Sequence, residues 1–428
     1  MADPMDTNTI TTMFPAQDYS LDDHAQVTGF KYELAPQVLA KLSQALPELQ
    51  TRDSGAIVCS FEWTTHPECE KLKAVARDWA RTHFDIIGCD NLIASDFDSL
   101  VSMTMARGRS ERMPAALKMM VWFFAFDNFV DEPAHMGADT RASHDLVDAV
   151  MSVFVLHDNH TSVGGGGGEG DAAGIVKKYG EEYRGYGRAV RVIRESARDW
   201  WDEIRQLGMS TRQQCRFVSV FKRYLDANAE QVAFRHRRHI PDLHTYKELR
   251  LYSIGWYVSG LTLEFVLGLD LPDEVLEHPL LSALQVATAF HIMFVNDIFS
   301  FRKELSDGDL MNLVPVLLWH NLESSKQHIL PTCGAVDELV QETVSQALGL
   351  VREMDEECVR LMAKIRAAVR GEGGMLAEAE AVERYVDGVS DWLSGNLQWH
   401  RISKRYVHNN NNNNPSLSIS KPTSLPYL

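Results

Sequence analysis

Apolar residues recur at the spacing of an α-helix along most of this chain. Between residues 31 and 407 they fall three and four positions apart in one segment after another. We find no series of strands with alternating apolar and polar positions. The pattern therefore predicts an all-α fold.

Two segments indicate where predicted helices begin and how deeply they are buried. Pro114 suits the first turn of a helix, where its missing N–H group is not needed, and Pro133 would end the same helix. Further along, Leu280–Val295 is apolar on nearly every side. Such a segment is typical of a helix that is buried within a core.

A third predicted helix covers Pro241–Leu269 and contains two glycines. Asp242 is a suitable N-cap because its carboxylate can accept hydrogen bonds from the first free N–H groups. Gly255 and Gly260 indicate either close packing against a neighbouring helix or a local break in this one. The pattern leaves both interpretations open.

The composition changes at both ends of the chain and once within it. Residues 1–30 are polar and mixed and are expected to form a loose arm, while the asparagine-rich residues 408–428 are expected to form a disordered tail. The glycine-rich residues 162–174 are typical of a loop insertion, since they lack the GK[ST] sequence and preceding strand of a phosphate-binding loop. We therefore predict one helical domain over residues 31–407.

The chain is acidic, which disfavours nucleic acid as a partner. Its 428 residues include 42 Lys and Arg against 59 Asp and Glu, a formal net charge of −17. The short basic run Arg235–His239 precedes Pro241 and is expected to be a solvated helix end. An anionic substrate would need local cations or metal ions.

Several features of the sequence predict a cytoplasmic protein. The six cysteines are scattered without metal-binding spacing, so we expect reduced thiols in the core. The first residues contain neither the basic region nor the apolar stretch of a signal peptide. The apolar run Met119–Phe126 is far shorter than the roughly 18 residues that a membrane span needs, so no span is expected.

Candidate chemistry lies at the end of the predicted buried helix. Asn296, Ser300 and Glu304 follow it at intervals of four, so an α-helix would align an amide oxygen, a hydroxyl and a carboxylate on one face. Oxygens on a buried helix need partners. All three are hard donors that suit Mg²⁺ better than a soft metal.

A second group of oxygen donors ends the helix that begins near Pro114. Asp127 and Asp131 are four residues apart and share a face, while Glu132 points about 140° from Asp127 by helical geometry. Acidic residues oppose the dipole at a helix C-terminus, so both a solvated helix end and a metal site are possible interpretations. Because Mg²⁺ in proteins shares phosphate oxygens, two such groups together point to a phosphorylated substrate.

The first two motifs resemble the metal motifs of class I terpene synthases. The stretch from Asn296 to Glu304 matches the second metal motif of that family, with Lys303 as the basic residue before the glutamate. The stretch from Asp127 to Glu132 is similar to its aspartate-rich motif, although Asn128 stands at the second position.

Two further segments add to this resemblance in the order that the family requires. Arg250, upstream of the second metal motif, resembles the diphosphate-sensing arginine, and Arg405-Tyr406 resembles the Arg-Tyr pair near the C-terminus of microbial members. The four motifs span most of the predicted domain.

The resemblance implies a fold, an activity and a set of ligands. The fold would be the single helical bundle of class I terpene synthases around a central active-site cavity. Three Mg²⁺ ions would bind the diphosphate of a prenyl substrate through Asp127, Asp131, Glu132, Asn296, Ser300 and Glu304. Hydrogen bonds to the diphosphate would come from Arg250, Lys303, Arg405 and Tyr406. The sequence does not decide whether Asp131 or Glu132 assists Asp127.

The implied reaction is ionisation of the substrate to an allylic cation, which then cyclises. Farnesyl diphosphate is the expected substrate and a sesquiterpene the expected product, formed by a monomer or a homodimer. The cation requires a dry pocket, in which aromatic faces can stabilise it. Candidate lining residues are Phe123, Trp256, Phe290, Trp319 and Trp399, although plain core packing is the commoner role. His291 is expected to be a core histidine with its hydrogen bonds satisfied.

Three other functions compete with this one. A chain-elongating prenyltransferase of the same fold should carry two aspartate-rich motifs, and a class II cyclase should carry a DxDD sequence, which is absent. A non-catalytic homologue that binds prenyl diphosphates would explain Asn128. It is disfavoured because the other motif residues are intact.

Overall fold

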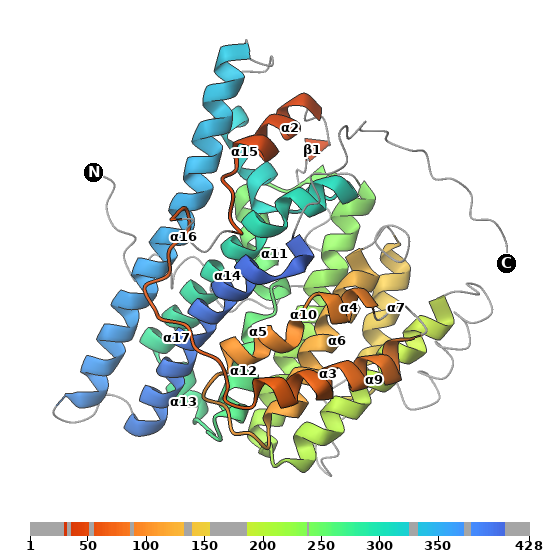
Figure 1. Cartoon of the computed structure of the whole chain (residues 1–428), viewed down its shortest axis with the longest axis vertical. Coiled ribbons are helices and arrows are strands. Elements are labelled where there is room, and N and C mark those ends of the chain that lie inside the picture. The colour runs from red at the N-terminus through yellow and green to blue at the C-terminus, as the bar shows by residue number, and fades with distance from the viewer. Residues whose placement is uncertain are drawn as a thin grey trace.

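Helices make up nearly all the regular structure of the computed structural model (Figure 1). The structure describes residues 30–31, 36–50, 55–85, 90–131, 139–154, 186–237, 239–324, 333–371 and 378–406. The helices of the first half are α2 (Pro36–Ala45), α3 (Cys69–Phe84), α4 (Asp90–Ala94), α5 (Phe97–Thr104), α6 (Met113–Asp131), α7 (Thr140–Met151), α9 (Tyr186–Gln206) and α10 (Thr211–Arg237).

The second half continues in the same way and ends in a short 3₁₀ turn. Its elements are α11 (Leu243–Ser253), α12 (Trp256–Val266), α13 (Asp273–Leu276), α14 (Pro279–Asp307), α15 (Leu313–Ser324), α16 (Cys333–Arg370), α17 (Ala379–Ile402) and η3 (Lys404–Tyr406). The strands β1 (Phe30–Lys31) and β2 (His239–Ile240) form one antiparallel pair. The predicted all-α class is confirmed.

The long apolar helix α14 lies within the bundle. It packs against α16, α17, α12 and α15, and Figure 1 shows α16 and α17 running alongside it. In length and composition α14 could cross a membrane, but 67% of its apolar window is buried inside the protein. That burial is characteristic of a core helix, as the apolar run Leu280–Val295 predicts.

Helix α6 carries the other candidate motif and begins where the sequence predicts. Pro114 lies in its first turn, and the helix ends at Asp131 in the described part of the chain. It packs against α3, α5, α9 and α10. Pro133, the predicted stop, lies outside the described residues.

The predicted helix over Pro241–Leu269 is two helices, α11 and α12. Asp242 caps α11 as predicted, accepting hydrogen bonds from the N–H groups of the second and third following residues at 2.9 and 3.0 Å. Gly255 adopts a φ of +75° between the two helices, which accounts for the break. At Gly260 a Cβ would lie 3.1 Å from the hydroxyl of Tyr385, which is close packing. Each of the two interpretations is therefore realised, at different glycines.

The structure tests only some of the predictions about the chain ends and the thiols. The predicted arm (1–30, apart from Phe30), the glycine-rich insertion (162–174) and the tail (408–428) lie outside the described residues. Free thiols occur at Cys59, Cys69, Cys215 and Cys358 in the described part. Cys215 is exposed, so the expectation of core thiols is wrong for that residue.

Candidate active site

The three oxygen donors of α14 lie on successive turns near its C-terminal end. Ser300 is buried, while Asn296 and Glu304 are half-buried. Burial raises the pKa of the Glu304 carboxyl, and the negative charge of Asp309 adds to this effect. The three side chains therefore form the column that the four-residue spacing predicts, and two of them are partly exposed at the edge of the core.

An asparagine beyond the helix holds two of these side chains in place. Asn312 is buried, and its Nδ2 donates to Glu304 Oε2 at 2.8 Å and to Ser300 Oγ at 3.4 Å. The same nitrogen donates to the backbone carbonyl of Asp297 at 2.7 Å. Asn312 was not identified from the sequence. It lies eight positions after Glu304, but α14 ends at Asp307, so helical spacing no longer relates the two side chains.

Arg250 reaches the same column from α11. Its Nη2 donates to Asp297 Oδ1 at 2.6 Å and to Asn296 Oδ1 at 3.2 Å. The Asp297 side chain is 1% exposed and that of Arg250 12% exposed, so this is a buried ion pair. The other oxygen of Asp297 accepts from the N–H of Leu313 at 2.9 Å. Both oxygens of Asp297 are thus engaged within the protein, Oδ1 by Arg250 and Oδ2 by the backbone of Leu313.

The other candidate motif is fixed by a tyrosine from α10. Asp127 is half-buried, and the hydroxyl of Tyr224 donates to its Oδ1 at 2.7 Å. Tyr224 in turn stacks on Phe123, with ring centroids 4.9 Å apart. The side chain of Asp131 and the whole of Glu132 lie outside what the structure describes, so their contribution stays a prediction.

The turn η3 joins the two motifs. Arg405 Nη2 donates to Asn128 Oδ1 on α6 at 3.1 Å. The hydroxyl of the next residue, Tyr406, accepts from Asn296 Nδ2 on α14 at 3.4 Å. Because adjacent residues contact both helices, the ends of α6 and α14 that carry the oxygen donors lie close together. The sequence motifs imply this proximity, but no contact that requires it can be read from the sequence.

The donors gathered here suit a hard divalent cation. They comprise the carboxylates of Asp127 and Glu304, the amide oxygen of Asn296 and the hydroxyl of Ser300. Oxygen ligands of this kind are those that Mg²⁺ prefers in proteins. The residues present therefore fit the metal that the sequence motifs imply.

Comparison with known families gives the class of the protein. Residues 118–346, more than half of the chain, match the family described as terpene synthase family 2, C-terminal metal binding. The chain belongs to the terpene synthase family. The matched residues contain both metal motifs and Arg250, so the family match and the geometry concern the same part of the molecule.

Named relatives and solved structures agree with this assignment. Sesquiterpene synthase Agr3 of Cyclocybe aegerita is 26% identical over 81% of this chain and 86% of its own length. Delta(6)-protoilludene synthase of Armillaria gallica is 25% identical over 82% of this chain and 87% of its own length. The crystal structure of germacradien-4-ol synthase from Streptomyces citricolor matches with a TM-score of 0.61 at 20% identity, covering 82% of this chain and 99% of that chain. The last comparison establishes the fold.

Burial sets the protonation of two rings beside Asn296 in this terpene synthase. It raises the pKa of Tyr406 to about 12 and lowers that of His400 to about 4, so both are neutral at neutral pH. His400 Nδ1 donates to the carbonyl of Asn396 at 2.8 Å, which leaves Nε2 to accept from Asn296 Nδ2 at 3.4 Å. The His400 and Tyr406 rings stack with centroids 5.2 Å apart.

Arg235 corrects one prediction from the sequence. It is 9% exposed, and its Nε donates to Asp309 Oδ2 at 2.8 Å, while its Nη1 lies 3.4 Å from the carbonyl oxygen of Val130. The prediction of a solvated helix end is wrong for Arg235, although His236 and Arg237 are exposed. The reason is that Arg235 connects the end of α6 with Asp309, which lies just after α14.

Lys303 is placed differently from the other predicted diphosphate ligands. Its Nζ donates to Asp307 Oδ2 at 2.7 Å, one turn along α14, and its side chain is 36% exposed. The contacts given above bring Arg250, Arg405 and Tyr406 to the metal motifs. The contact of Lys303 directs it along the exposed side of the helix.

The aromatic residues proposed from the sequence differ in their surroundings. Phe123 packs on the tyrosine that holds Asp127, whereas Trp399 donates from its Nε1 to the carbonyl of Asp96 at 3.0 Å. Trp256 is buried edge-on against Trp392, with centroids 5.5 Å apart. Of these three, Phe123 is tied most directly to a candidate metal ligand.

Proposed function

We propose that this terpene synthase is a Mg²⁺-dependent cyclase that ionises farnesyl diphosphate and closes the resulting cation to a sesquiterpene. The observation that supports this most directly is the contact of Arg405 and Tyr406 with α6 and α14, respectively. Through this contact the two sets of oxygen donors lie close to Arg405 and Tyr406, the side chains that we propose as diphosphate ligands. The C15 substrate is supported by relatives named as sesquiterpene synthases.

The proposed metal ligands divide between the two helices. Three Mg²⁺ ions would be held by Asp127, Asp131, Glu132, Asn296, Ser300 and Glu304. Bound Mg²⁺ supplies charge neutralisation for the diphosphate leaving group. Asn312 and Tyr224 would fix the orientation of the ligands, since each donates a hydrogen bond to one carboxylate oxygen.

Arg250 would bind the diphosphate from its place on α11. Its guanidinium donates to Asn296 Oδ1 and to Asp297 Oδ1, and these contacts keep it beside the proposed metal ligands. From this position it would donate charge-assisted hydrogen bonds to the diphosphate. Arg405 and protonated Tyr406 would donate to the same group, since both are already placed at the motifs.

Other parts of the prediction are carried forward as proposals. Residues 31–407 would form the catalytic domain, with the insertion near 162–174 as a loop. The enzyme would be soluble and cytoplasmic. A chain-elongating prenyltransferase is disfavoured because its second metal motif should be aspartate-rich, whereas α14 presents Asn296, Ser300 and Glu304.

Product analysis tests the proposal. The purified protein is incubated with C10, C15 and C20 prenyl diphosphates and Mg²⁺, and volatile products are identified by mass, with Glu304→Ala as the matched blank. We expect a cyclic C15 hydrocarbon or alcohol. EDTA should abolish its formation, and added Mg²⁺ should restore it. The absence of any terpene from all three substrates would overturn the cyclase function, and preference for another chain length would overturn the C15 assignment.

A further inference from the structure

Away from the two metal motifs, Cys59, His291 and Asp355 converge from three separate segments. Cys59 belongs to the chain before α3, His291 to α14 and Asp355 to α16. One ligand atom from each residue lies within 4.8 Å of the other two. A sulfur, a nitrogen and an oxygen donor therefore share one small volume inside the protein.

His291 lacks the partners that a buried histidine needs. Its side chain is 0% exposed, and neither ring nitrogen has a hydrogen-bond partner among the described residues. The expectation of a satisfied core histidine is therefore wrong. Buried polar groups are rarely left without a hydrogen-bond partner, so the two unpaired nitrogens of this imidazole indicate a binding site for a ligand.

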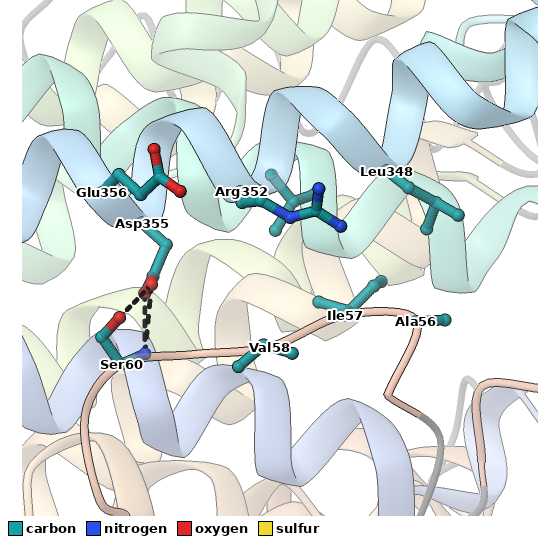
Figure 2. Close-up of a pocket in the computed structure, with 9 residues that line it drawn as sticks. Ala56, Ile57, Val58, Ser60, Leu348, Arg352, Asp355 and Glu356 are labelled. Carbon is teal, nitrogen blue, oxygen red and sulfur yellow. Dashed lines mark hydrogen bonds between the residues drawn. The ribbon is translucent and has the colours of Figure 1, made fainter.

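Asp355 is already oriented by a neighbouring serine. It is buried, and Ser60 donates to it through both its backbone N–H, at 3.0 Å from Oδ1, and its hydroxyl (Figure 2). Such contacts characterise carboxylates that bind metals, because they fix the direction of the remaining lone pairs. The serine follows Cys59 directly, so one short stretch supplies a ligand and orients another.

We propose that Cys59, His291 and Asp355 bind one Zn²⁺ ion. Sulfur and imidazole ligands favour zinc over Mg²⁺, and a thiolate with a carboxylate balances its two charges. Small side-chain movements would bring the three atoms to the roughly 2.0–2.3 Å bonds of a zinc site, with water as the fourth ligand. Binding converts the Cys59 thiol to a thiolate and releases one proton to solvent.

A cavity beside the cluster offers a path for the ion. It has a volume of about 270 Å³ and lies between residues 56–60 and α16, with Asp355 in its wall (Figure 2). Arg352 and Glu356 line the same cavity. Asp355 is the member of the cluster that lines this cavity.

The proposed zinc site is distinct from the catalytic metals and does not depend on the proposed function. His291 precedes Asn296 by five positions on α14, so their side chains point about 140° apart. The ion would connect the segment around Cys59 to α14 and α16. Its expected role is therefore to fasten that segment to the core.

Cobalt binding tests the proposal in the full-length protein. Co²⁺ is titrated into reduced, metal-free protein with excess Mg²⁺ present to occupy the oxygen sites. We expect one Co²⁺ per chain with a thiolate-to-cobalt charge-transfer band that Zn²⁺ removes. Cys59→Ser should abolish the band, while Cys215→Ser, a change at an exposed thiol, should preserve it.

A second variant separates metal binding from folding. Ser60→Ala should keep the charge-transfer band but weaken Zn²⁺ binding about 10- to 100-fold, since it removes one contact that orients Asp355. Zinc should raise the melting temperature of the parent protein and leave that of Cys59→Ser unchanged. Absence of the band in folded parent protein, its persistence in Cys59→Ser, or a native disulfide between Cys59 and Cys358 would each overturn the proposal.

Discussion

A single amide nitrogen orients two proposed metal ligands, and this gives Asn312 a measurable part in turnover. Asn312→Ala removes the donor to Glu304 and to Ser300. A hydrogen bond to a charged group contributes about 1.5–3 kcal/mol, so we expect turnover to fall about 10- to 100-fold. The Mg²⁺ concentration for half-maximal rate should rise as well.

The matched control for this variant is Asn321→Ala. Asn321 lies on α15 and donates to Thr343 and Gln346, away from the metal motifs. Steady-state rates over a range of Mg²⁺ concentrations compare the two variants. If both lose activity equally, Asn312 acts through general stability and not through the ligands.

The metal ligands themselves should be more sensitive. Asn296→Ala and Glu304→Ala are each expected to lower turnover at least ~100-fold, since misplacing a catalytic metal forfeits several kcal/mol of leaving-group stabilisation. Asp127→Asn should be comparably severe. Asn128→Ala should be mild, because that side chain carries no charge and accepts one hydrogen bond from Arg405. Near-parental rates for the α14 variants in assays with the C15 substrate would show that the column is structural.

At this scale the sequence identified the oxygen donors and missed the residues that hold them. Asn296, Ser300 and Glu304 could be found because four-residue spacing on a helix has a fixed geometric meaning. Tyr224 and Arg235 could not, because their contacts arise from the packing of α10 against helices that are distant in sequence. The position of Lys303 in the motif predicts a diphosphate ligand, but it does not reveal the ion pair of Lys303 with Asp307.

Among the elements, the break between α11 and α12 fixes where the helix that carries Arg250 ends and where the helix that begins at Trp256 starts. Gly255 holds a φ of +75°, and a Cβ there would meet Tyr224 at an ordinary 3.5 Å. The cost of Gly255→Ala is therefore conformational, about 1–2 kcal/mol of unfolding free energy. We expect turnover to fall too, because the change displaces the end of the helix that carries Arg250.

Urea unfolding measures this cost against a glycine in a regular helix. Gly349 lies within α16 with open space around it, so Gly349→Ala should stabilise the protein by about 0.5–1 kcal/mol. Equal destabilisation of both variants would contradict the role assigned to the backbone at Gly255. Helix starts such as Asp242 were predictable from capping chemistry, but which glycine breaks a helix depends on the neighbours it meets.

For the whole molecule, the completeness of the site depends on residues near the end of the described chain. Removing residues 409–428 should leave stability and turnover nearly unchanged, since an asparagine run buries no apolar area. Removing Arg405 and Tyr406 as well should sharply reduce turnover, because it takes away two of the proposed diphosphate ligands. Steady-state kinetics compare the turnover of the two truncated proteins. Equal activity would show that the Arg-Tyr pair is misassigned.

The overall architecture was predictable because it rests on local signals repeated many times. Helical periodicity gave the all-α class, and the order of four motifs gave the family. The convergence of α6, α14 and η3 was not predictable by this route, since it depends on long-range packing. The cluster of Cys59, His291 and Asp355 was hidden for the same reason, because its members lie on three segments without any shared spacing.

The turn η3 also bears on how the enzyme responds to heat. It follows the last long helix and is only three residues long, yet it supplies Arg405 and Tyr406. A single turn can open locally at a free energy below that of unfolding the whole protein. Warming would therefore open this turn, and displace the two proposed diphosphate ligands, while the bundle is still intact. Catalysis should fail several degrees before the helices melt, and a bound diphosphate should narrow that gap by holding the turn closed.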